Sequence, residues 1–441
     1  MAVTKYPANL PGHPEHHSLP EVYRSISIPP RAGIIKKMLA FAGPAYLVSV
    51  GYMDPGNWAT DIEAGARFGG SLLWVILLSN VIAIILQTLS ARLGLASGRD
   101  LAEACREYYP PWSRIPMWLM AEIAIIACDL AEVMGGAVGI NLLTGLPMFW
   151  CVFLMGLDVV ILLIIQHLGM RKLELVVVAL VTVVMGCFIA ELIIARPDWG
   201  HIGHDLLHPG MSMDMLYVAI GIIGATVMPH NLYLHSSIVQ TRRVRQTKKG
   251  ILEAARFNFV DSITALNLAL IVNGLILLMA ATAFHQFGAG IRSLQEAFRM
   301  LSPLLGASLA SILFAVALIA SGQSSTLTGT LAGQIIMEGF LCIEMAPWIR
   351  RLITRGLALG PALAVVSYGG EAASWRLLVL SQVVLSMQLP FAVIPLVQFT
   401  SSRRIMGPLA NPRWLSALAW GCAALIIALN IWLLASFLLP G

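Results

Sequence analysis

The sequence contains few charged residues. Asp, Glu, Lys and Arg make up 12% of its 441 residues, about half the share found in an ordinary soluble domain. Hydrophobic residues make up 58%, and the mean hydropathy is +0.80. A soluble chain this apolar could not cover its own surface with polar groups, which excludes soluble enzymes and nucleic-acid-binding proteins. The composition indicates a polytopic protein whose main partner is the lipid bilayer.

Several motifs are also missing. The six cysteines are scattered without a CxxC spacing, which argues against a disulfide framework or a structural zinc site. The sequence has no HExxH motif of the kind an intramembrane metalloenzyme would use. It has no Asn-x-Ser/Thr acceptor, so we expect a bacterial inner-membrane protein. Residues 1–39 lack a signal-peptide pattern, and we expect them to form a disordered cytoplasmic tail.

Long segments without any charged residue recur along the chain, and each exceeds the roughly 20 residues that a helix needs to cross a bilayer. Together with stretches interrupted by a few acids, they predict an all-α membrane protein with eleven transmembrane helices. We expect the helices at residues 40–66, 71–95, 116–142, 147–168, 173–195, 214–240, 256–284, 302–325, 352–367, 376–400 and 415–438.

The basic residues set the orientation. With the N-terminus in the cytoplasm, the cytoplasmic segments hold 23 of the 28 Lys and Arg residues, as the positive-inside rule requires. An odd number of spans then puts the C-terminus outside. The basic residues that this orientation places outside are Arg67, Arg196, Arg292, Arg299 and Arg376.

Two of the predicted helices contain a proline beside polar residues: Asp54-Pro-Gly-Asn57 in the first and Met228-Pro-His230 in the sixth. Proline breaks a helix, and broken backbone within a bilayer persists where it lines a cavity. Breaks five spans apart predict an inverted repeat with its site at the membrane midplane. The alternative is that these prolines only kink packed helices.

The predicted domains follow from this repeat. The first repeat covers residues 40–200, the inverted second repeat covers residues 210–400, and helix 11 at residues 414–441 lies outside the repeat.

The groups at the breaks suit a transition metal. Asp54 offers a carboxylate, Asn57 an amide oxygen and Met228 a thioether, and unwinding frees main-chain carbonyls, with Gly51 and Ala225 as the obvious sources. Such a mixed oxygen and sulfur set favours Mn²⁺ or Fe²⁺ over Mg²⁺ or Ca²⁺. One carboxylate does not neutralise a dication, which suits an exchangeable ion better than a structural one. The alternative is that Met228 only packs in the core.

A second polar set indicates a proton route. On an α-helix, Asp129 lies about 20° and Glu132 about 80° around the axis from Glu122, so the three acids share one face. We expect this set to contain acids, titratable histidines and arginine counter-charges. Its members are Glu122, Asp129, Glu132, His230, His235, Arg350 and Arg351. The alternative is a static network that holds helices together.

These motifs resemble the signature of the Nramp divalent-metal transporters. The resemblance lies in residues 54–65, 228–235 and 320–326 and extends from about residue 34 to 438. It implies a LeuT-type fold with a 5+5 inverted repeat and proton-coupled uptake of Mn²⁺ or Fe²⁺, with Co²⁺ and Cd²⁺ also passing. The implied metal ligands are Asp54, Asn57, Met228 and the carbonyl of Ala225, joined by Gly51 in one conformation and approached by Gln382 when the site closes.

The resemblance also implies that Asp54 accepts a proton. Position 51 departs from the pattern, since it is Gly where Ala is expected, and the hinge there should be looser.

The predicted activity is alternating-access symport by a monomer with no bound cofactor, the metal ion and the proton being transported. Three other interpretations stay open. A small-metabolite carrier would fit the same fold, although Asp54 would repel an anionic substrate. An intramembrane metalloenzyme would need more histidine ligands, and a passive channel would need a selectivity ring.

Overall fold

The computed structural model describes residues 18–28, 33–166, 169–207, 210–245, 247–285, 295–297, 299, 308–343 and 345–438. Residues 1–17 and 29–32 of the expected tail lie outside the described residues.

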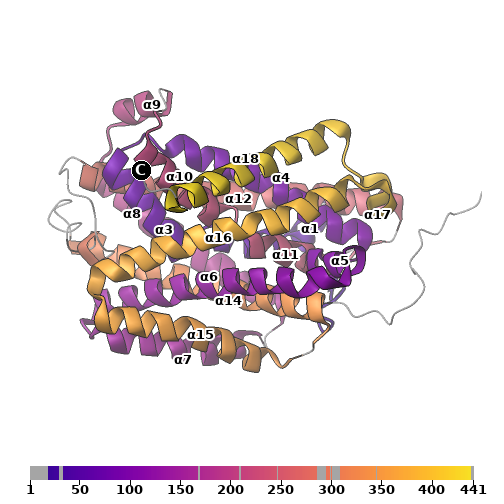
Figure 1. Ribbon diagram of the computed structural model, residues 1–441, viewed down its shortest axis with the longest axis horizontal. Helices are drawn as coiled ribbons and strands as arrows, with labels where there is room; N and C mark the ends of the chain where they lie inside the picture. The colour runs from indigo at the N-terminus through magenta and orange to yellow at the C-terminus, as the bar shows by residue number, and fades with distance from the viewer. Residues whose placement is uncertain are drawn as a thin grey trace, which may run out of the picture.

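The described part is almost entirely helical (Figure 1). The longer elements are α4 (Leu73–Ser97), α6 (Arg114–Thr144), α7 (Met148–Gln166), α8 (Met170–Ala195), α12 (Lys248–Phe284), α14 (Ser308–Leu341), α15 (Pro347–Tyr368), α16 (Gly370–Ser401) and α18 (Arg413–Leu438). The shorter helices are α1 (Ile34–Phe41), α2 (Pro44–Gly51), α3 (Pro55–Phe68), α5 (Leu101–Tyr108), α9 (Trp199–Leu207), α10 (Met213–Thr226), α11 (Pro229–Ile238) and α17 (Arg403–Met406). A two-stranded sheet joins β1 (Ile26–Ser27) to β2 (Arg242–Arg243).

Within the described residues, eight helical segments are long and apolar enough to cross a membrane, or nine if the bent pair α1 and α2 forms one span. The predicted helix at 352–367 corresponds to α15, whose first turns carry Arg350, Arg351 and Arg355. Those charges lower its hydropathy, so α15 is not among the eight. The total of eleven therefore remains a prediction.

The long helices run roughly parallel to the long axis of the molecule (Figure 1). Helix α14 packs along α6, α15 packs along α7, and α12 packs against α3 and α4. One large cluster of buried apolar side chains joins these helices. Large apolar side chains such as Phe153, Leu175 and Phe391 are exposed on the outside, as expected for a surface that faces lipid.

One boundary differs substantially from the sequence prediction. The eighth predicted helix ends at residue 325, whereas α14 continues to Leu341. The added segment contains Thr328, Thr330 and Gln334, which lower its hydropathy. Its threonines satisfy their hydroxyls within the helix, since Thr330 Oγ1 donates to Thr326 O at 2.7 Å. Burial and this internal bonding keep the segment helical.

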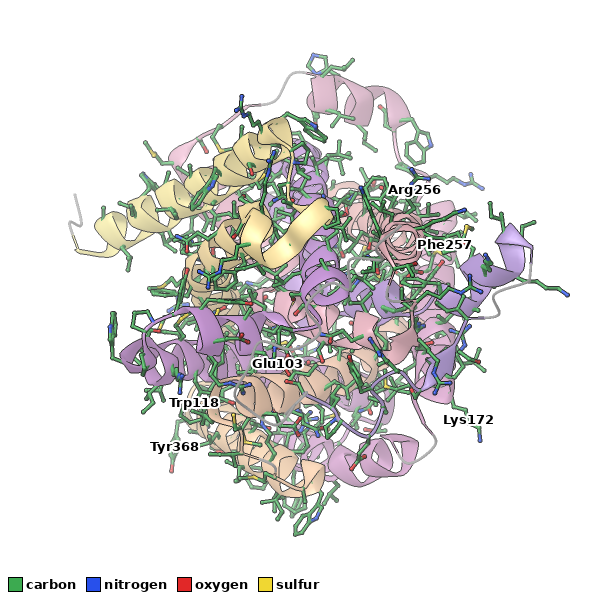
Figure 2. All side chains as sticks on the ribbon, turned by 90° about the vertical axis from the view of Figure 1, so that its right-hand side faces the viewer. Glu103, Trp118, Lys172, Arg256, Phe257 and Tyr368 are labelled. Carbon is green, nitrogen blue, oxygen red and sulfur yellow. The ribbon has the colours of Figure 1, made fainter. Side chains whose placement is uncertain are left out.

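The N-terminal segment also differs from the expected disordered tail. The backbone N–H of Ser18 donates to Glu103 Oε1 at 2.8 Å, and that of Leu19 donates to Glu338 Oε2 at 2.9 Å. Further along, Ile26 pairs with Arg242 in the parallel β1–β2 sheet. Residues 18–28 therefore bridge α5 and α14 to the end of the sixth predicted span, and we call them the N-terminal strap. Figure 2 views this end of the molecule, with Glu103 near its middle.

Candidate metal site

The first predicted break lies between α2 and α3. Pro55 has no N–H to donate, and Asp54 caps the new helix by accepting from Asn57 N at 2.9 Å. The carbonyls freed by the break accept bonds from side chains, as buried backbone requires. Gly51 O accepts from Asn57 Nδ2 at 3.3 Å, Tyr52 O from Asn273 Nδ2 at 2.8 Å, and Met53 O from Trp58 Nε1 at 3.0 Å and from Ser321 Oγ.

The second break lies between α10 and α11, where Met228 immediately precedes Pro229. Met228 has no exposed surface and belongs to a small buried cluster with Ala124, Cys128 and Leu385. Helix α10 packs against α3, and α11 packs against α2. The two broken helices are thus antiparallel and meet at their breaks, as an inverted repeat requires.

Three oxygen atoms converge where the breaks meet, and we call this place the convergence point. Asn57 Nδ2 lies 2.6 Å from Asp54 Oδ1, 3.1 Å from Ala225 O and 3.3 Å from Gly51 O. A hydrogen-bond donor thus occupies the point on which an anionic oxygen and two carbonyls are directed. Asp54 Oδ2 and Asn57 Oδ1 are buried without a hydrogen-bond partner among the described residues. A cation at this point would be bound by these same oxygens, with Asn57 turning its Oδ1 inward.

Two further predicted residues lie at the edge of this site. Gln382 is buried on α16, and a Cβ added to Gly56 would lie 1.8 Å from its Nε2. The amide therefore sits against the first turn of α3, which only a glycine at position 56 permits. His230 directly follows Pro229 and is buried, and its Nδ1 has no partner among the described residues. The structure thus brings Asp54, Asn57, Met228, the two carbonyls and Gln382 into one region.

The acids of α6 form a separate network with α15. Arg350 Nη2 lies 2.5 Å from Glu122 Oε1, and Arg351 Nη2 lies 2.9 Å from Asp129 Oδ1. Glu132 accepts from Ser325 Oγ at 2.7 Å. Asp129 also accepts from Arg355 Nη1 at 2.8 Å. The sequence prediction missed Arg355, although its spacing of four residues from Arg351 puts both on the same face of a helix.

Cys128 lies between the network and the breaks. Its Sγ lies 3.5 Å from Glu132 Oε1, and the same side chain belongs to the apolar cluster around Met228. Cys128 was not among the predicted site residues.

His235 does not join the acidic network with which it was grouped. Its Nδ1 lies 3.0 Å from Gln87 Oε1, and its Nε2 lies 3.2 Å from Asn258 Oδ1. Gln87 in turn donates to Tyr52 Oη at 2.8 Å. His235 therefore connects α11 to α4 and α12. The sequence spacing gives the angle between His235 and His230 around the helix axis. It does not show which residues of other helices His235 contacts.

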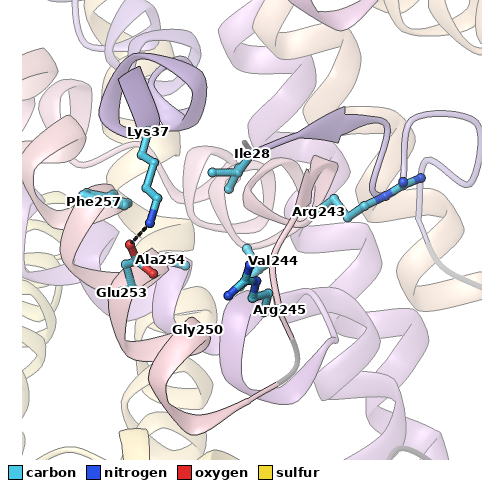
Figure 3. Close-up of a pocket in the computed structure, with 9 residues that line it drawn as sticks. All are labelled: Ile28, Lys37, Arg243, Val244, Arg245, Gly250, Glu253, Ala254 and Phe257. Atoms are coloured by element: carbon cyan, nitrogen blue, oxygen red, sulfur yellow. Dashed lines mark hydrogen bonds and ion pairs between the residues drawn. The ribbon is translucent and has the colours of Figure 1, made fainter. Parts of the chain in front are cut away.

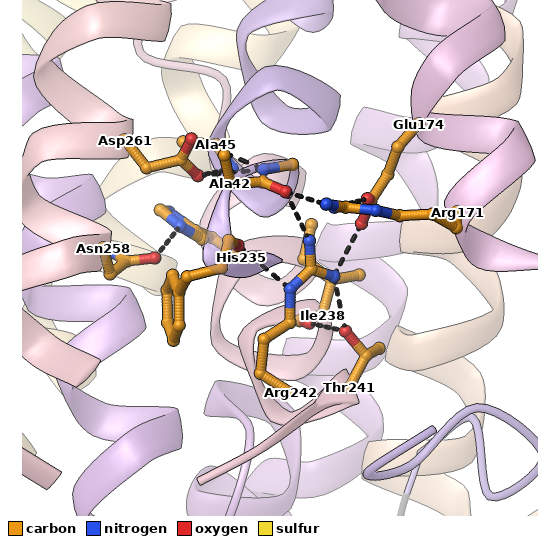
Figure 4. A network of polar contacts seen from close by, with 12 residues as sticks. Ala42, Ala45, Arg171, Glu174, His235, Ile238, Thr241, Arg242, Asn258 and Asp261 are labelled. Carbon is orange, nitrogen blue, oxygen red and sulfur yellow. Dashed lines mark hydrogen bonds and ion pairs between the residues drawn. The ribbon is translucent and has the colours of Figure 1, made fainter. Parts of the chain in front are cut away.

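A third polar network holds the junction between α1 and α2 (Figure 4). Arg242 donates to Phe41 O at 3.0 Å and to Ala42 O at 2.8 Å, and it pairs with Glu174 at 2.6 Å. On the other side of the junction, Asp261 Oδ2 accepts from Ala45 N at 3.0 Å. We call this arrangement the α1–α2 junction network. Its cation binds the carbonyl end of one helix and its carboxylate binds the amide end of the next.

A small surface pocket lies away from the breaks, between α1, β2 and the start of α12 (Figure 3). It contains the ion pair of Lys37 with Glu253 at 2.9 Å. In the described part of the chain, no cluster of three His, Cys, Asp or Glu side chains could hold a metal ion. The donors at the breaks are of other kinds, namely an amide, two carbonyls and a thioether beside one carboxylate.

The chain is similar to known proteins over nearly its whole length. The family model described as Nramp, natural resistance-associated macrophage protein-like, matches residues 45–436. A "divalent metal cation transporter MntH" of Nostoc sp. is 56% identical over 421 residues, covering 95% of each chain. A protein with the same description in Mesorhizobium japonicum is 54% identical over 422 residues, covering 95% of this chain and 93% of its own.

Solved structures of transporters have a similar fold. A manganese transporter of Eremococcus coleocola superposes with a TM-score of 0.89 at 36% identity, over 95% of this chain and 91% of its own. The nucleobase-cation-symport-1 family transporter Mhp1 superposes with a TM-score of 0.61 at 17% identity, over 88% of this chain and 91% of its own. The predicted fold class, an all-α membrane protein with a LeuT-type repeat and two broken helices, is confirmed.

Proposed function

Because the chain belongs to the Nramp family, whose members are membrane transporters and not enzymes, we propose that it carries divalent transition-metal ions, Mn²⁺ or Fe²⁺, into the cell together with protons. Co²⁺ and Cd²⁺ are further substrates in this proposal. The observation that supports this proposal most strongly is the convergence of Asp54 Oδ1, Ala225 O and Gly51 O on a single point where two broken helices meet.

The proposed ligands are Asp54, Asn57, Met228 and the carbonyl of Ala225, with Gly51 O and Gln382 taking part in particular conformations. Oxygen ligands suit Mn²⁺ and Fe²⁺, and the thioether of Met228 disfavours Ca²⁺ and Mg²⁺, which prefer oxygen throughout. The relatives from Nostoc and Mesorhizobium, described as divalent metal cation transporters, support a divalent metal. The similarity to the manganese transporter of Eremococcus coleocola supports Mn²⁺ among these metals.

Alternating access is the proposed mechanism. Asp54, Asn57 and Met228 have no exposed surface in this structure, so the ion enters and leaves only when the helices around the breaks move. An inside-negative potential favours the inward movement of a dication by about 4.6 kcal/mol per 100 mV. A potential of this size is sufficient to drive uptake, so the proposal does not require tight proton coupling.

The proposed proton acceptor is Asp54, and the protons leave through His230 and the acidic network of α6 and α15. Two contacts support this route: Cys128 lies against Glu132 and belongs to the cluster around Met228. His235 lies in a different network, so we place it at the cytoplasmic side of the break and not on the proton route.

We propose an inner-membrane location with the N-terminus in the cytoplasm, the C-terminus outside and a monomer as the working unit. The helices α1, α5 and α17, which lie next to basic segments, are found at one end of the molecule, whereas α9 and the end of α18 lie toward the other (Figure 1). This separation supports the orientation because basic residues stay in the cytoplasm.

The test is Mn²⁺ uptake into proteoliposomes, with internal pH measured at the same time. Saturable Mn²⁺ influx with acidification of the interior is the expected result. Mn²⁺ influx without acidification would contradict the coupling alone. No Mn²⁺ influx would contradict the metal assignment, and amino-acid uptake would then be measured to test the metabolite carrier.

A further inference from the structure

We infer that Asn231 is a further residue of the metal site and that its amide oxygen favours harder ions such as Mn²⁺ over softer ones such as Cd²⁺. The inference rests on the proposed function. Asn231 lies in the first turn of α11, where its backbone N–H donates to Met228 O at 3.2 Å. Its side chain has no exposed surface.

The amide of Asn231 lies directly beside the thioether. Its Nδ2 is 3.7 Å from Met228 Sδ and 3.4 Å from Val48 O. Its Oδ1 is buried and has no hydrogen-bond partner among the described residues. A buried amide oxygen without a partner is unfavourable because it has lost its hydrogen bonds to water, so such an atom indicates a ligand that supplies the missing interaction.

Rotation of this amide exchanges its two ends and places Oδ1 beside Met228 Sδ. Two ligands at right angles around one ion, with bonds of about 2.1–2.3 Å, lie about 3.0–3.3 Å apart. The separation of 3.7 Å between the amide position and Sδ is close to that value. A small movement of either side chain lets both atoms contact the same ion.

The space for this amide exists because residue 51 is a glycine. A Cβ added to Gly51 would lie 2.3 Å from Asn231 Nδ2 and 3.2 Å from Met228 Sδ. The alanine that the family resemblance suggests at position 51 therefore conflicts with this placement of Asn231. Gly51 and Asn231 form a matched pair, in which the Asn231 amide occupies the space that a Cβ at position 51 would need.

The selectivity follows from ligand chemistry. Amide oxygen is a hard donor that suits Mn²⁺, whereas thioether sulfur is soft. Adding an amide oxygen next to Met228 raises the affinity for Mn²⁺ more than that for Cd²⁺. A purely structural role, in which Asn231 only links α11 to Val48 O, predicts equal effects on both ions.

The experiment measures Mn²⁺ and Cd²⁺ binding by calorimetry for the wild type, Asn231→Leu and Asn80→Leu. Asn80 is the matched control, since it is a buried amide on α4 that bonds to Asn267. We expect Asn231→Leu to lower the ratio of Mn²⁺ to Cd²⁺ affinity by about three- to tenfold, and Asn80→Leu to leave it unchanged. An unchanged ratio in Asn231→Leu, with Mn²⁺ still bound by the wild type, would overturn the inference. Absence of Mn²⁺ binding by the wild type would overturn the proposed function instead.

The pairing is tested separately on the metal-free protein by thermal unfolding. We expect Gly51→Ala to lower Tm because its Cβ displaces the Asn231 amide, and Gly51→Ala/Asn231→Ala to recover the loss. Additive losses in the double variant would show that the two residues do not share this space.

Discussion

The breaks and the α6–α15 network, two of the buried polar regions of this protein, satisfy their charged groups in opposite ways. At the breaks, oxygen atoms of Asp54, Asn57 and Gln382 have no hydrogen-bond partner among the described residues. Along α6, by contrast, Glu122 and Asp129 contact arginines of α15 at 2.5–2.9 Å. One region leaves room for a positive charge, and the other already contains it.

This difference indicates what each region does. A buried charge without a partner is costly in an apolar interior, so unpaired oxygens persist where a ligand provides the partner. Buried ion pairs contribute little net stability compared with apolar packing. The arginines of α15 therefore keep the acids of α6 buried and charged, as the proposed proton route requires.

The largest expected effect comes from Asp54, whose carboxylate lies at the convergence point. Asp54→Asn removes the anionic oxygen, and we expect Mn²⁺ affinity to fall by more than about 100-fold because a buried dication loses its counter-charge. Both Mn²⁺ uptake and coupled acidification should disappear. Binding is measured by calorimetry and uptake in proteoliposomes, and normal uptake would contradict the site assignment.

A smaller and more selective effect is expected in the paired region. Asp129→Asn should reduce proton movement by about tenfold while changing Mn²⁺ affinity less than about twofold, because Asp129 contacts arginines and not the convergence point. Arg351→Ala should act in the same direction. The comparison is made by recording internal pH and Mn²⁺ uptake in the same vesicles. Equal losses of both would favour a static network.

The sulfur at the second break should control which ions are accepted. Met228→Ala should leave Mn²⁺ uptake partly intact, reduced by about two- to fivefold, and let Ca²⁺ compete better, because the remaining donors are all oxygen. Competition of Ca²⁺ against labelled Mn²⁺ measures this. If Ca²⁺ stays excluded, the thioether does not select the ion.

The smallest effect is expected at the N-terminal strap. Leu19→Asp puts a carboxylate in the buried apolar cluster that the Leu19 side chain belongs to, on a residue whose backbone N–H already binds Glu338. The buried, unpaired charge should detach the strap. We expect hydrogen exchange in residues 18–28 to increase, with a change in uptake of no more than about twofold. Ser25→Asp, at an exposed position of the strap, is the control. No change in exchange would mean that these contacts do not hold the strap.

The sequence predicted the features that depend on local chemistry. Prolines at 55 and 229 determine the breaks, and the helical period determines the shared face of Glu122, Asp129 and Glu132. The candidate ligands Asp54, Asn57 and Met228 were chosen from the residue types at those breaks, whereas Gln382 was implied only by the family resemblance. The pairing of Arg350 and Arg351 with these acids was predicted from their opposite charges alone.

Other features depend on contacts between distant segments and could not be predicted. Nothing local in the strap indicates that Ser18 meets Glu103, 85 positions away. The same holds for Arg242, which contacts Glu174 and the end of α1. The relation between Gly51 and Asn231 also appears only when α2 and α11 are placed side by side.

The α1–α2 junction network holds one end of α2, and the other end of α2 lies at the convergence point. One end of this eight-residue helix is fixed because Asp261 holds its amide end and Arg242 holds the preceding carbonyls. The other end carries Gly51 O, which contacts the convergence point. With a rise of 1.5 Å per residue, the helix is about 12 Å long, and a tilt of about 10° moves its free end by about 2 Å. A tilt of this size would move Gly51 O away from the other two oxygens, and in the proposed function it would remove one ligand from the metal.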